Sequence, residues 1–155
     1  MKLCMIGTGY VGLVSGTCFA DIGHQVYCVD KDEAKIEKLN SSQSPIYEPG
    51  LDELIKENYK ANRLFFTSNL SEAVNKSDIV FICVGTPNKK KSLLVDLKYV
   101  YQAVKDIKKV SKGKKIIVTK STVPVGTGDQ IEKILKNKKK FTIISNPEFL
   151  REGEA

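Results

Sequence analysis

The chain has 155 residues, of which 41% are apolar and 28% charged, and its formal net charge is +7. A chain of this length corresponds to one globular domain that needs neither disulfides nor a metal to fold. No apolar run approaches the roughly 18 residues of a membrane span. The four cysteines lack CxxC spacing and the chain has a single histidine, which excludes a disulfide framework and a zinc site. We therefore expect a cytoplasmic protein with reduced, buried thiols.

Short apolar runs rich in β-branched residues predict six strands. Apolar residues occupy both faces of these runs, which is typical of the buried strands of a parallel sheet. In chain order the predicted strands are Lys2–Ile6, Gln25–Val29, Leu64–Thr67, Ile79–Val84, Ile116–Thr119 and Phe141–Ser145.

Longer segments with helical periodicity separate these strands, and their apolar residues recur at the spacing of a helix that packs on a sheet. They are Val11–Ile22, Asp32–Leu39, Leu51–Tyr59, Leu97–Lys109 and Gly128–Leu135. Residues typical of helix N-caps precede helices at three places: Asn69 with Glu72, Asp96, and Thr127 with Gln130. The alternation predicts a doubly wound α/β (Rossmann) fold, a mostly parallel six-stranded sheet with helices on both faces.

Residues 7–12 match the GxGxxG pattern, directly after the first predicted strand and at the start of the first predicted helix. In this context Gly7 allows a tight turn, Gly9 lets a pyrophosphate approach the backbone, and Gly12 lets the helix pack against the strand. Asp30 follows the next strand, eighteen residues after Gly12. A carboxylate there accepts both ribose hydroxyls of an adenosine and repels the 2′-phosphate of NADP, so the pattern predicts NAD as the cofactor.

Three alternatives stay open for this loop. Lys31 and Lys35 leave some affinity for NADP. Enzymes that use S-adenosylmethionine also combine a glycine loop with a later acid, although the spacing here favours a dinucleotide. A purely structural interpretation makes the glycines helix-packing residues and Asp30 an N-cap.

Polar and turn-forming residues follow the last three predicted strands. The segments concerned are residues 85–87, 120–126 and 146–153. Each places a hydroxyl or a carboxylate at the carboxyl edge of the sheet, where ligands of open α/β folds bind. A single turn of this kind is ordinary, but three in register favour a substrate site beside the nicotinamide.

Five motifs in this chain resemble the NAD-binding domain of the UDP-glucose and GDP-mannose dehydrogenases. They are Gly7–Leu13, Pro45–Leu51, Val84–Pro87, Ser121–Gly126 and Asn146–Gly153, in the family's order and over essentially the whole chain. The Tyr-Glu-Pro-Gly-Leu loop is more similar to the UDP-glucose branch. The resemblance implies oxidation of UDP-glucose by two NAD and water to UDP-glucuronate; GDP-mannose or a UDP-N-acetyl sugar is the alternative substrate.

The resemblance also implies roles for individual residues. The cofactor-binding set is Gly7, Gly9, Tyr10, Val11, Gly12, Asp30, Lys35, Thr86, Thr122 and Glu152. The catalytic pair is Thr122, which positions a water, and Glu148, which activates water against a thioester intermediate. The substrate-binding set is Glu148, Phe149, Leu150, Arg151 and Glu152.

The environment of Glu148 leads to a further expectation. A carboxylate partly desolvated at a sheet edge should have a pKa raised toward the working range of a base. The structural alternative is a helix-start carboxylate after Pro147. The segment from Asn88 to Val95 departs from the family by carrying a lysine triplet where a glycine turn is usual.

The family's cysteine nucleophile has no counterpart among the four cysteines. Cys4, Cys28 and Cys83 fall in predicted strands and Cys18 in the first helix, where we expect inert buried thiols. We therefore expect residues 1–155 to be the N-terminal part of a longer enzyme, lacking its central helix and substrate domain. The isolated chain should bind NAD without oxidising UDP-glucose, and should be monomeric although the longer protein is a homo-oligomer.

Two other functional classes stay open. The first is a dinucleotide-binding module without catalysis. The second is a nucleic-acid binder, because sixteen of the 25 basic but only four of the eighteen acidic residues fall between Lys89 and Lys140. No aromatic residues interleave with these lysine clusters as base stacking requires, so we interpret them as solvated charge and expect no nucleic-acid partner.

Overall fold

One parallel sheet forms the centre of the molecule. The computed structural model describes residues 1–88, 95–136, 139–151 and 153. Within these residues the strands are β1 (Lys2–Ile6), β2 (Gln25–Val29), β3 (Leu64–Thr67), β4 (Ile79–Ile82), β5 (Lys115–Thr119) and β6 (Phe141–Ser145). Their order is β3-β2-β1-β4-β5-β6 and each neighbouring pair is parallel, which confirms the predicted doubly wound sheet.

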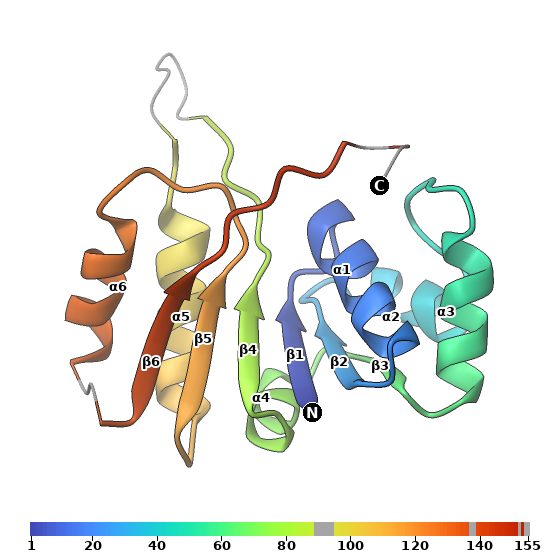
Figure 1. Cartoon of the computed structure of the whole chain (residues 1–155), viewed down its shortest axis with the longest axis horizontal. Helices are drawn as coiled ribbons and strands as arrows, with labels where there is room; N and C mark the ends of the chain where they lie inside the picture. The colour runs from blue at the N-terminus through green and yellow to red at the C-terminus, as the bar shows by residue number, and fades with distance from the viewer. Residues whose placement is uncertain (89–94, 137–138, 152, 154–155) are drawn as a thin grey trace.

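Helices cover both faces of the sheet (Figure 1). The core of one face includes residues of α1 (Tyr10–Asp21), α2 (Glu33–Asn40) and α3 (Leu51–Lys60). That of the other face includes residues of α4 (Leu70–Lys76), α5 (Lys98–Val110) and α6 (Thr127–Leu135). Alternate residues of β1 enter the two cores, Leu3 and Met5 the first, Cys4 and Ile6 the second. Strands β1, β4 and β5 are largely buried because helices cover both faces there. The edge strand β6 departs from the prediction of two buried faces, since Thr142 and Ile144 on one of its faces are exposed.

Helix starts agree only partly with the predicted caps. The Asn69 side chain accepts the Glu72 N–H at 3.1 Å and caps α4, as predicted. The prediction for Thr127 is wrong, because α6 begins after Gly126, whose φ of +84° is left-handed. Thr127 already lies in the helix, and its hydroxyl donates to the carbonyl oxygen of Pro124 at 2.7 Å.

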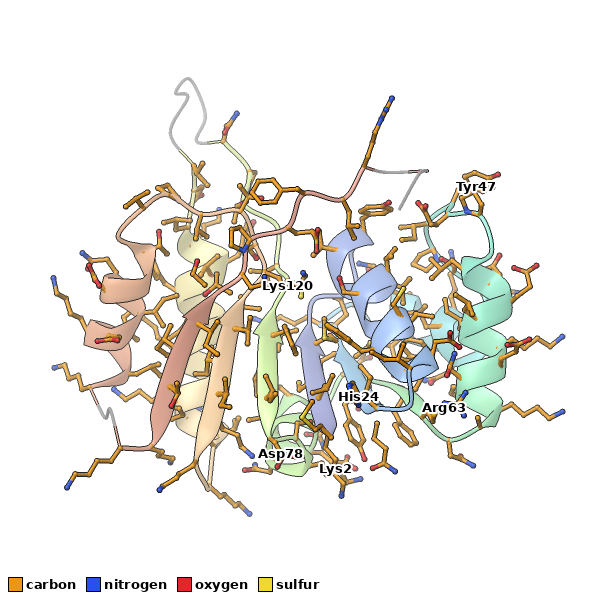
Figure 2. All side chains as sticks on the ribbon, viewed as in Figure 1. Lys2, His24, Tyr47, Arg63, Asp78 and Lys120 are labelled. Carbon is orange, nitrogen blue, oxygen red and sulfur yellow. The ribbon has the colours of Figure 1, made fainter. Side chains whose placement is uncertain are left out.

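The strand register brings the carboxyl ends of five strands together. Ile6 of β1 lies opposite both Val29 of β2 and Ile82 of β4. The same register continues through Thr119 of β5 to Ser145 of β6. The next residues, listed across the sheet, are Asp30, Gly7, Cys83, Lys120 and Asn146. Figure 2 shows Lys120 at this edge and Lys2 and Asp78 at the opposite one.

Strand β4 is shorter than predicted. It ends at Ile82, so Cys83 and Val84 lie beyond the strand, where the chain leaves the sheet toward Pro87. In the part of the chain that the structure describes, no helix combines the length and apolar character needed to cross a membrane.

Candidate functional site

The glycine loop connects β1 to α1 by a turn that only glycine fits. Gly7 has a φ of +100°, and a Cβ there would lie 2.8 Å from the carbonyl oxygen of Cys83. A Cβ on Gly12 would lie 1.9 Å from the carbonyl oxygen of Gly7. The tight turn and the close helix packing predicted from the sequence are therefore present.

Gly9 faces open space rather than protein. Apart from Gly9 itself and its two chain neighbours, no atom lies within 4 Å of the position that its Cβ would take. Gly9 is also the N-cap residue of α1, so the first N–H groups of a 12-residue helix follow it. Such N–H groups and the helix dipole favour a phosphate at this position.

Asp30 closes the other side of the loop through a dense set of hydrogen bonds. Its Oδ2 accepts the Thr8 N–H at 2.9 Å, the Thr8 hydroxyl at 2.7 Å and the Lys35 ammonium at 3.2 Å. Its Oδ1 accepts the Asp32 N–H at 3.2 Å. Desolvation raises the pKa of Asp30, but the hydrogen bonds from Thr8, Asp32 and Lys35 outweigh it and lower the pKa below the ordinary 3.8.

The purely structural interpretation of Asp30 is wrong. The N-cap of α2 is Asp32, whose side chain accepts the Lys35 N–H at 3.1 Å. Asp30 instead lines a cavity of about 460 Å³ together with Gly7, Gly9 and Lys35. Four of the predicted cofactor-binding residues thus surround one space at the carboxyl edge of the sheet.

Part of this cavity was missed by the sequence analysis. The missed wall is formed by Tyr99, Gln102, Ala103 and Asp106 of α5, whereas Val84 and Gly85, which also line the cavity, belong to a motif that the sequence marks. The periodicity of this helix predicts its buried face, but no motif marks the residues that look into the cavity. Asp106 also pairs with Lys31 across the opening at 3.6 Å.

The remaining predicted cofactor residues lie outside the lining of this cavity. The Tyr10 hydroxyl lies beside Glu48, and Val11 packs against the core. Thr86 is half-buried and Thr122 is exposed in the loops after β4 and β5. Glu152, predicted for both cofactor and substrate, lies outside the described residues, as does the lysine triplet 89–91.

The chain after β6 crosses the carboxyl edge of the sheet toward α1, where it appears red in Figure 1. We call residues 146–151 and 153 the strap. The Asn146 N–H donates to the Thr119 carbonyl at 3.0 Å, and the Glu148 N–H donates to the Lys120 carbonyl at 3.1 Å. The strap therefore begins as a backbone extension of the β5–β6 pairing.

Glu148 forms an ion pair with Lys120, with 2.5 Å between Oε2 and Nζ. The two side chains are only 15% and 10% exposed. Glu148 Oε1 also accepts the N–H groups of Phe149 and Leu150, at 2.7 and 3.0 Å. Desolvation raises the pKa of Glu148, but the hydrogen bonds from Lys120, Phe149 and Leu150 and the charge of Lys120 bring it below the ordinary 4.5.

The predicted upward shift of the Glu148 pKa is therefore wrong, because the partly buried carboxylate lies beside the charged Lys120. The helix-start alternative is also absent, since the described part of the strap contains no helix after Pro147. Glu148 is held as a carboxylate at the site edge. An ionised carboxylate so oriented can accept a hydrogen bond from a hydroxyl or a water.

Three of the four cysteines are buried, as predicted for inert thiols. Cys4, Cys28 and Cys83 are buried, and all four cysteines are free. Burial raises the pKa of each, that of Cys83 to about 12 despite the opposing charge of Lys120. Cys18 is exposed, contrary to prediction, yet desolvation and Asp21 raise its pKa too. A raised pKa is the opposite of an activated nucleophile.

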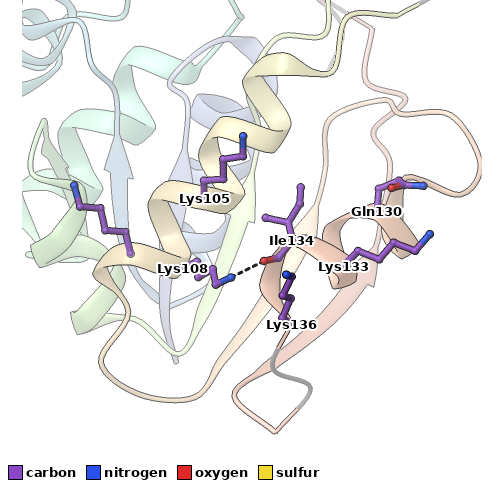
Figure 3. Close-up of a pocket in the computed structure, with 7 residues that line it drawn as sticks. Lys105, Lys108, Gln130, Lys133, Ile134 and Lys136 are labelled. Atoms are coloured by element: carbon purple, nitrogen blue, oxygen red, sulfur yellow. Dashed lines mark hydrogen bonds between the residues drawn. The ribbon is translucent and has the colours of Figure 1, made fainter.

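A separate hollow of about 680 Å³ lies between α5 and α6. It is lined mainly by lysines, Lys105, Lys108, Lys109, Lys133 and Lys136. Figure 3 shows Lys108 donating to the Ile134 carbonyl of α6, at 2.7 Å, while Lys105 and Lys133 extend away from that contact. Lysines at helix ends favourably meet the carbonyl groups there, which agrees with solvated charge. The described residues contain no cluster of His, Cys, Asp and Glu able to hold a metal ion.

The comparisons with known proteins agree with this geometry. Residues 1–155 match the UDP-glucose/GDP-mannose dehydrogenase family, NAD binding domain. UDP-glucose 6-dehydrogenases of Rhizobium meliloti and Bacillus subtilis are 56% and 52% identical to this chain, over 100% and 99% of its length. The matches cover 36% and 34% of those relatives, so this chain spans about a third of their length.

Solved structures give the same result. A UDP-glucose dehydrogenase from Pyrobaculum islandicum has a TM-score of 0.92 and 38% identity. A GDP-mannose dehydrogenase from Pseudomonas aeruginosa, solved as a ternary complex, has a TM-score of 0.91 and 37% identity. Each covers 99% of this chain and 37% of its own. The chain belongs to the UDP-glucose/GDP-mannose dehydrogenase family, in which it is the NAD-binding domain.

Proposed function

We propose that this chain is the cofactor-binding domain of an oxidoreductase that converts UDP-glucose, two NAD and water to UDP-glucuronate and two NADH. Its similarity to two UDP-glucose 6-dehydrogenases, at 56% and 52% identity, favours UDP-glucose over GDP-mannose or a UDP-N-acetyl sugar. Since the chain spans about a third of these relatives, we assign the cysteine nucleophile and most of the sugar-nucleotide site to a further domain.

The observation that carries the proposal is the ionised Asp30 opposite an open Gly9. The adenosine ribose would bind at Asp30, whose Oδ1 accepts one N–H and has capacity for a further donor. The pyrophosphate would bind at the N–H groups that begin α1 beside Gly9. NAD, when bound, supplies a nicotinamide ring that accepts hydride.

Asp30 also explains the choice of NAD over NADP. Its carboxylate stays ionised, so a 2′-phosphate at the same position would meet like charge. Lys35, the nearest cation, is already paired with that carboxylate at 3.2 Å. Lys31 forms its ion pair with Asp106 instead. These pairings leave the ribose pocket suited to hydroxyls rather than phosphate.

On the substrate side we assign Thr86 and Thr122 to the nicotinamide end of the site. Thr122 would orient a water toward the reacting carbon. Glu148, kept ionised by Lys120, would accept a hydrogen bond from that water and hold it in place for the catalytic step, and the exposed Phe149 and Leu150 would contact the sugar nucleotide. The four free thiols fit a reducing cytoplasm, and we place homo-oligomerisation in the remainder of the enzyme.

A titration with NADH tests the proposal, because the chain has no tryptophan and the coenzyme's own fluorescence is the signal. Asp30→Asn should weaken NADH binding about tenfold, the cost of one charge-assisted hydrogen bond, and should narrow the preference over NADPH. Asp129→Asn, an exposed aspartate on α6, is the matched control and should bind like the parent.

The outcome also separates the alternatives. Binding of S-adenosylmethionine with no binding of NADH would overturn the proposal. A salt-sensitive shift of RNA or DNA at physiological ionic strength would favour the basic-surface alternative. NADH formation from UDP-glucose by the 155-residue chain alone would contradict the assignment of the nucleophile to another domain.

A further inference from the structure

The loop between α2 and α3 holds a buried carboxylate that the NAD site does not use. Glu48 is only 9% exposed although it lies in a surface loop. Its Oε2 accepts the Tyr10 hydroxyl at 2.9 Å and the Gly153 N–H at 2.7 Å. Burial of a carboxylate is costly unless such donors compensate it. These two contacts stabilise the carboxylate in its buried position.

Glu48 joins segments that are distant in the sequence. Tyr10 is the first residue of α1 and follows Gly9 of the phosphate loop directly. The Tyr10 hydroxyl also lies 2.8 Å from the carbonyl oxygen of Arg151. Phosphate loop, Glu48 loop and strap therefore meet at one group of polar atoms.

The strap is held at both ends and exposed between them. Its beginning is fixed by the Lys120–Glu148 pair and by backbone hydrogen bonds to β5. Its end is fixed by Tyr10 and Glu48. Between these tethers Phe149 is 85% exposed and Leu150 is 38% exposed. Ordering a chain segment costs conformational entropy. The tether at Tyr10 and Glu48 therefore determines what fraction of the time Phe149 and Leu150 are held in this arrangement.

We propose that Glu48 is a positioning residue for the substrate site. By holding Gly153 and Tyr10 it fixes the strap above the phosphate loop, and it thereby sets the affinity for the sugar nucleotide while leaving the ribose pocket at Asp30 unchanged. The inference rests on the proposed function for its substrate, but the tether itself is independent of that function.

Hydrogen exchange of the 155-residue chain without cofactor tests the tether. Glu48→Ala should speed exchange of the Gly153 N–H about tenfold or more, because a hydrogen bond to a charged acceptor is lost. Glu48→Gln retains an oxygen acceptor and should give a smaller effect. Glu53→Ala, an exposed glutamate in the next helix, is the matched control and should change nothing.

Protection of Val118 in β5 reports whether a variant is folded. If Glu48→Ala fails to fold, Tyr10→Phe tests the same tether by removing one hydroxyl, and should also speed exchange at Gly153. Unchanged exchange at Gly153 in the folded variants would overturn the proposal. This result does not depend on NADH binding, so failure of the proposed function is recognised separately.

Kinetics of the longer enzyme test the positioning role. Glu48→Ala should raise the KM for UDP-glucose about tenfold while the KM for NAD stays within about twofold, and Glu48→Gln should recover part of the loss. A variant that is merely less stable would not raise the KM for UDP-glucose relative to the KM for NAD. An equal rise in both KM values, or no rise in either, would contradict the positioning role.

Discussion

The two carboxylates of the site are each held by a lysine, but the surrounding structure differs. Asp30 accepts hydrogen bonds from Thr8, Asp32 and Lys35, which lie in the glycine loop and at the start of α2. Glu148 lies on the strap, and its lysine comes from the end of β5. The cofactor side is built largely from neighbouring strand ends and a short stretch of chain. The strap, which we propose as the substrate side, is built from segments that meet only in the folded molecule.

The two sides therefore differ in how far they are organised before a ligand binds. The cofactor side is organised before NAD arrives, since its backbone is fixed between β1, β2 and α1. The substrate side depends on two tethers and presents apolar side chains to solvent. Contacts with the rest of a longer enzyme would complete it. Three substitution experiments test how rigidly the cofactor side and the strap are built.

The largest expected effect is on the cofactor side. Gly12→Ala would place a methyl group 1.9 Å from the Gly7 carbonyl oxygen, so the helix must move. We expect a loss of about 3 kcal/mol in the free energy of unfolding, together with loss of NADH binding. Gly128→Ala in α6 meets no atom within 4 Å and should stabilise the chain by about 0.5 kcal/mol. Urea unfolding measures both, and equal effects would contradict the close-packing argument.

An intermediate effect is expected for the two lysines. Lys120→Met leaves Glu148 largely buried without its cation and should cost about 2 kcal/mol, part of which Glu148→Gln in the same chain should restore. Lys35→Met should cost about 0.5 kcal/mol, because Thr8 and Asp32 still donate to Asp30. Urea unfolding measures both losses in the free energy of unfolding. A larger loss for Lys35→Met than for Lys120→Met would contradict this prediction.

The smallest effect is the pH dependence of stability. The pKa values of Asp30 and Glu148 are lowered in the folded chain, so the unfolded chain binds more protons at acidic pH. Their stabilisation should be complete above the ordinary values of 3.8 and 4.5 and should be lost as the pH falls through the lowered ones. Asp30→Asn and Glu148→Gln should each flatten this decline between pH 6 and 3, measured by thermal unfolding. A variant as acid-sensitive as the parent would show that its carboxylate carries no such linkage.

The parts of the site with local determinants are the ones that the sequence predicts. Gly7, Gly12 and Asp30 could be assigned because a strand, a turn and a helix adjoin them, and the structure confirms the turn and the packing. The Tyr10–Glu48 and Glu48–Gly153 contacts span 38 and 105 residues, and no periodicity reports such pairs.

The error at Glu148 has a different origin. Burial alone would raise the pKa of Glu148, but the same packing places Lys120 beside it, which lowers that pKa. Lys120 and Asn146 follow adjacent predicted strands, and Lys120 Nζ lies 3.4 Å from Asn146 Oδ1 and 2.5 Å from Glu148. Placing the strand ends in register would have brought Lys120 beside Glu148, whereas the cavity wall on α5 required the packing of a helix across the sheet.

The position of β1 has a consequence for how the chain is made. Of the six strands of this sheet it comes earliest in the chain, yet it lies at the centre between β2 and β4. Until residue 82 has been added, one side of β1 has no strand to pair with, and its backbone N–H and C=O groups on that side remain an unpaired sheet edge. A nascent chain of this protein therefore passes through a stage in which half a sheet is complete and its most buried strand is the most vulnerable to aggregation.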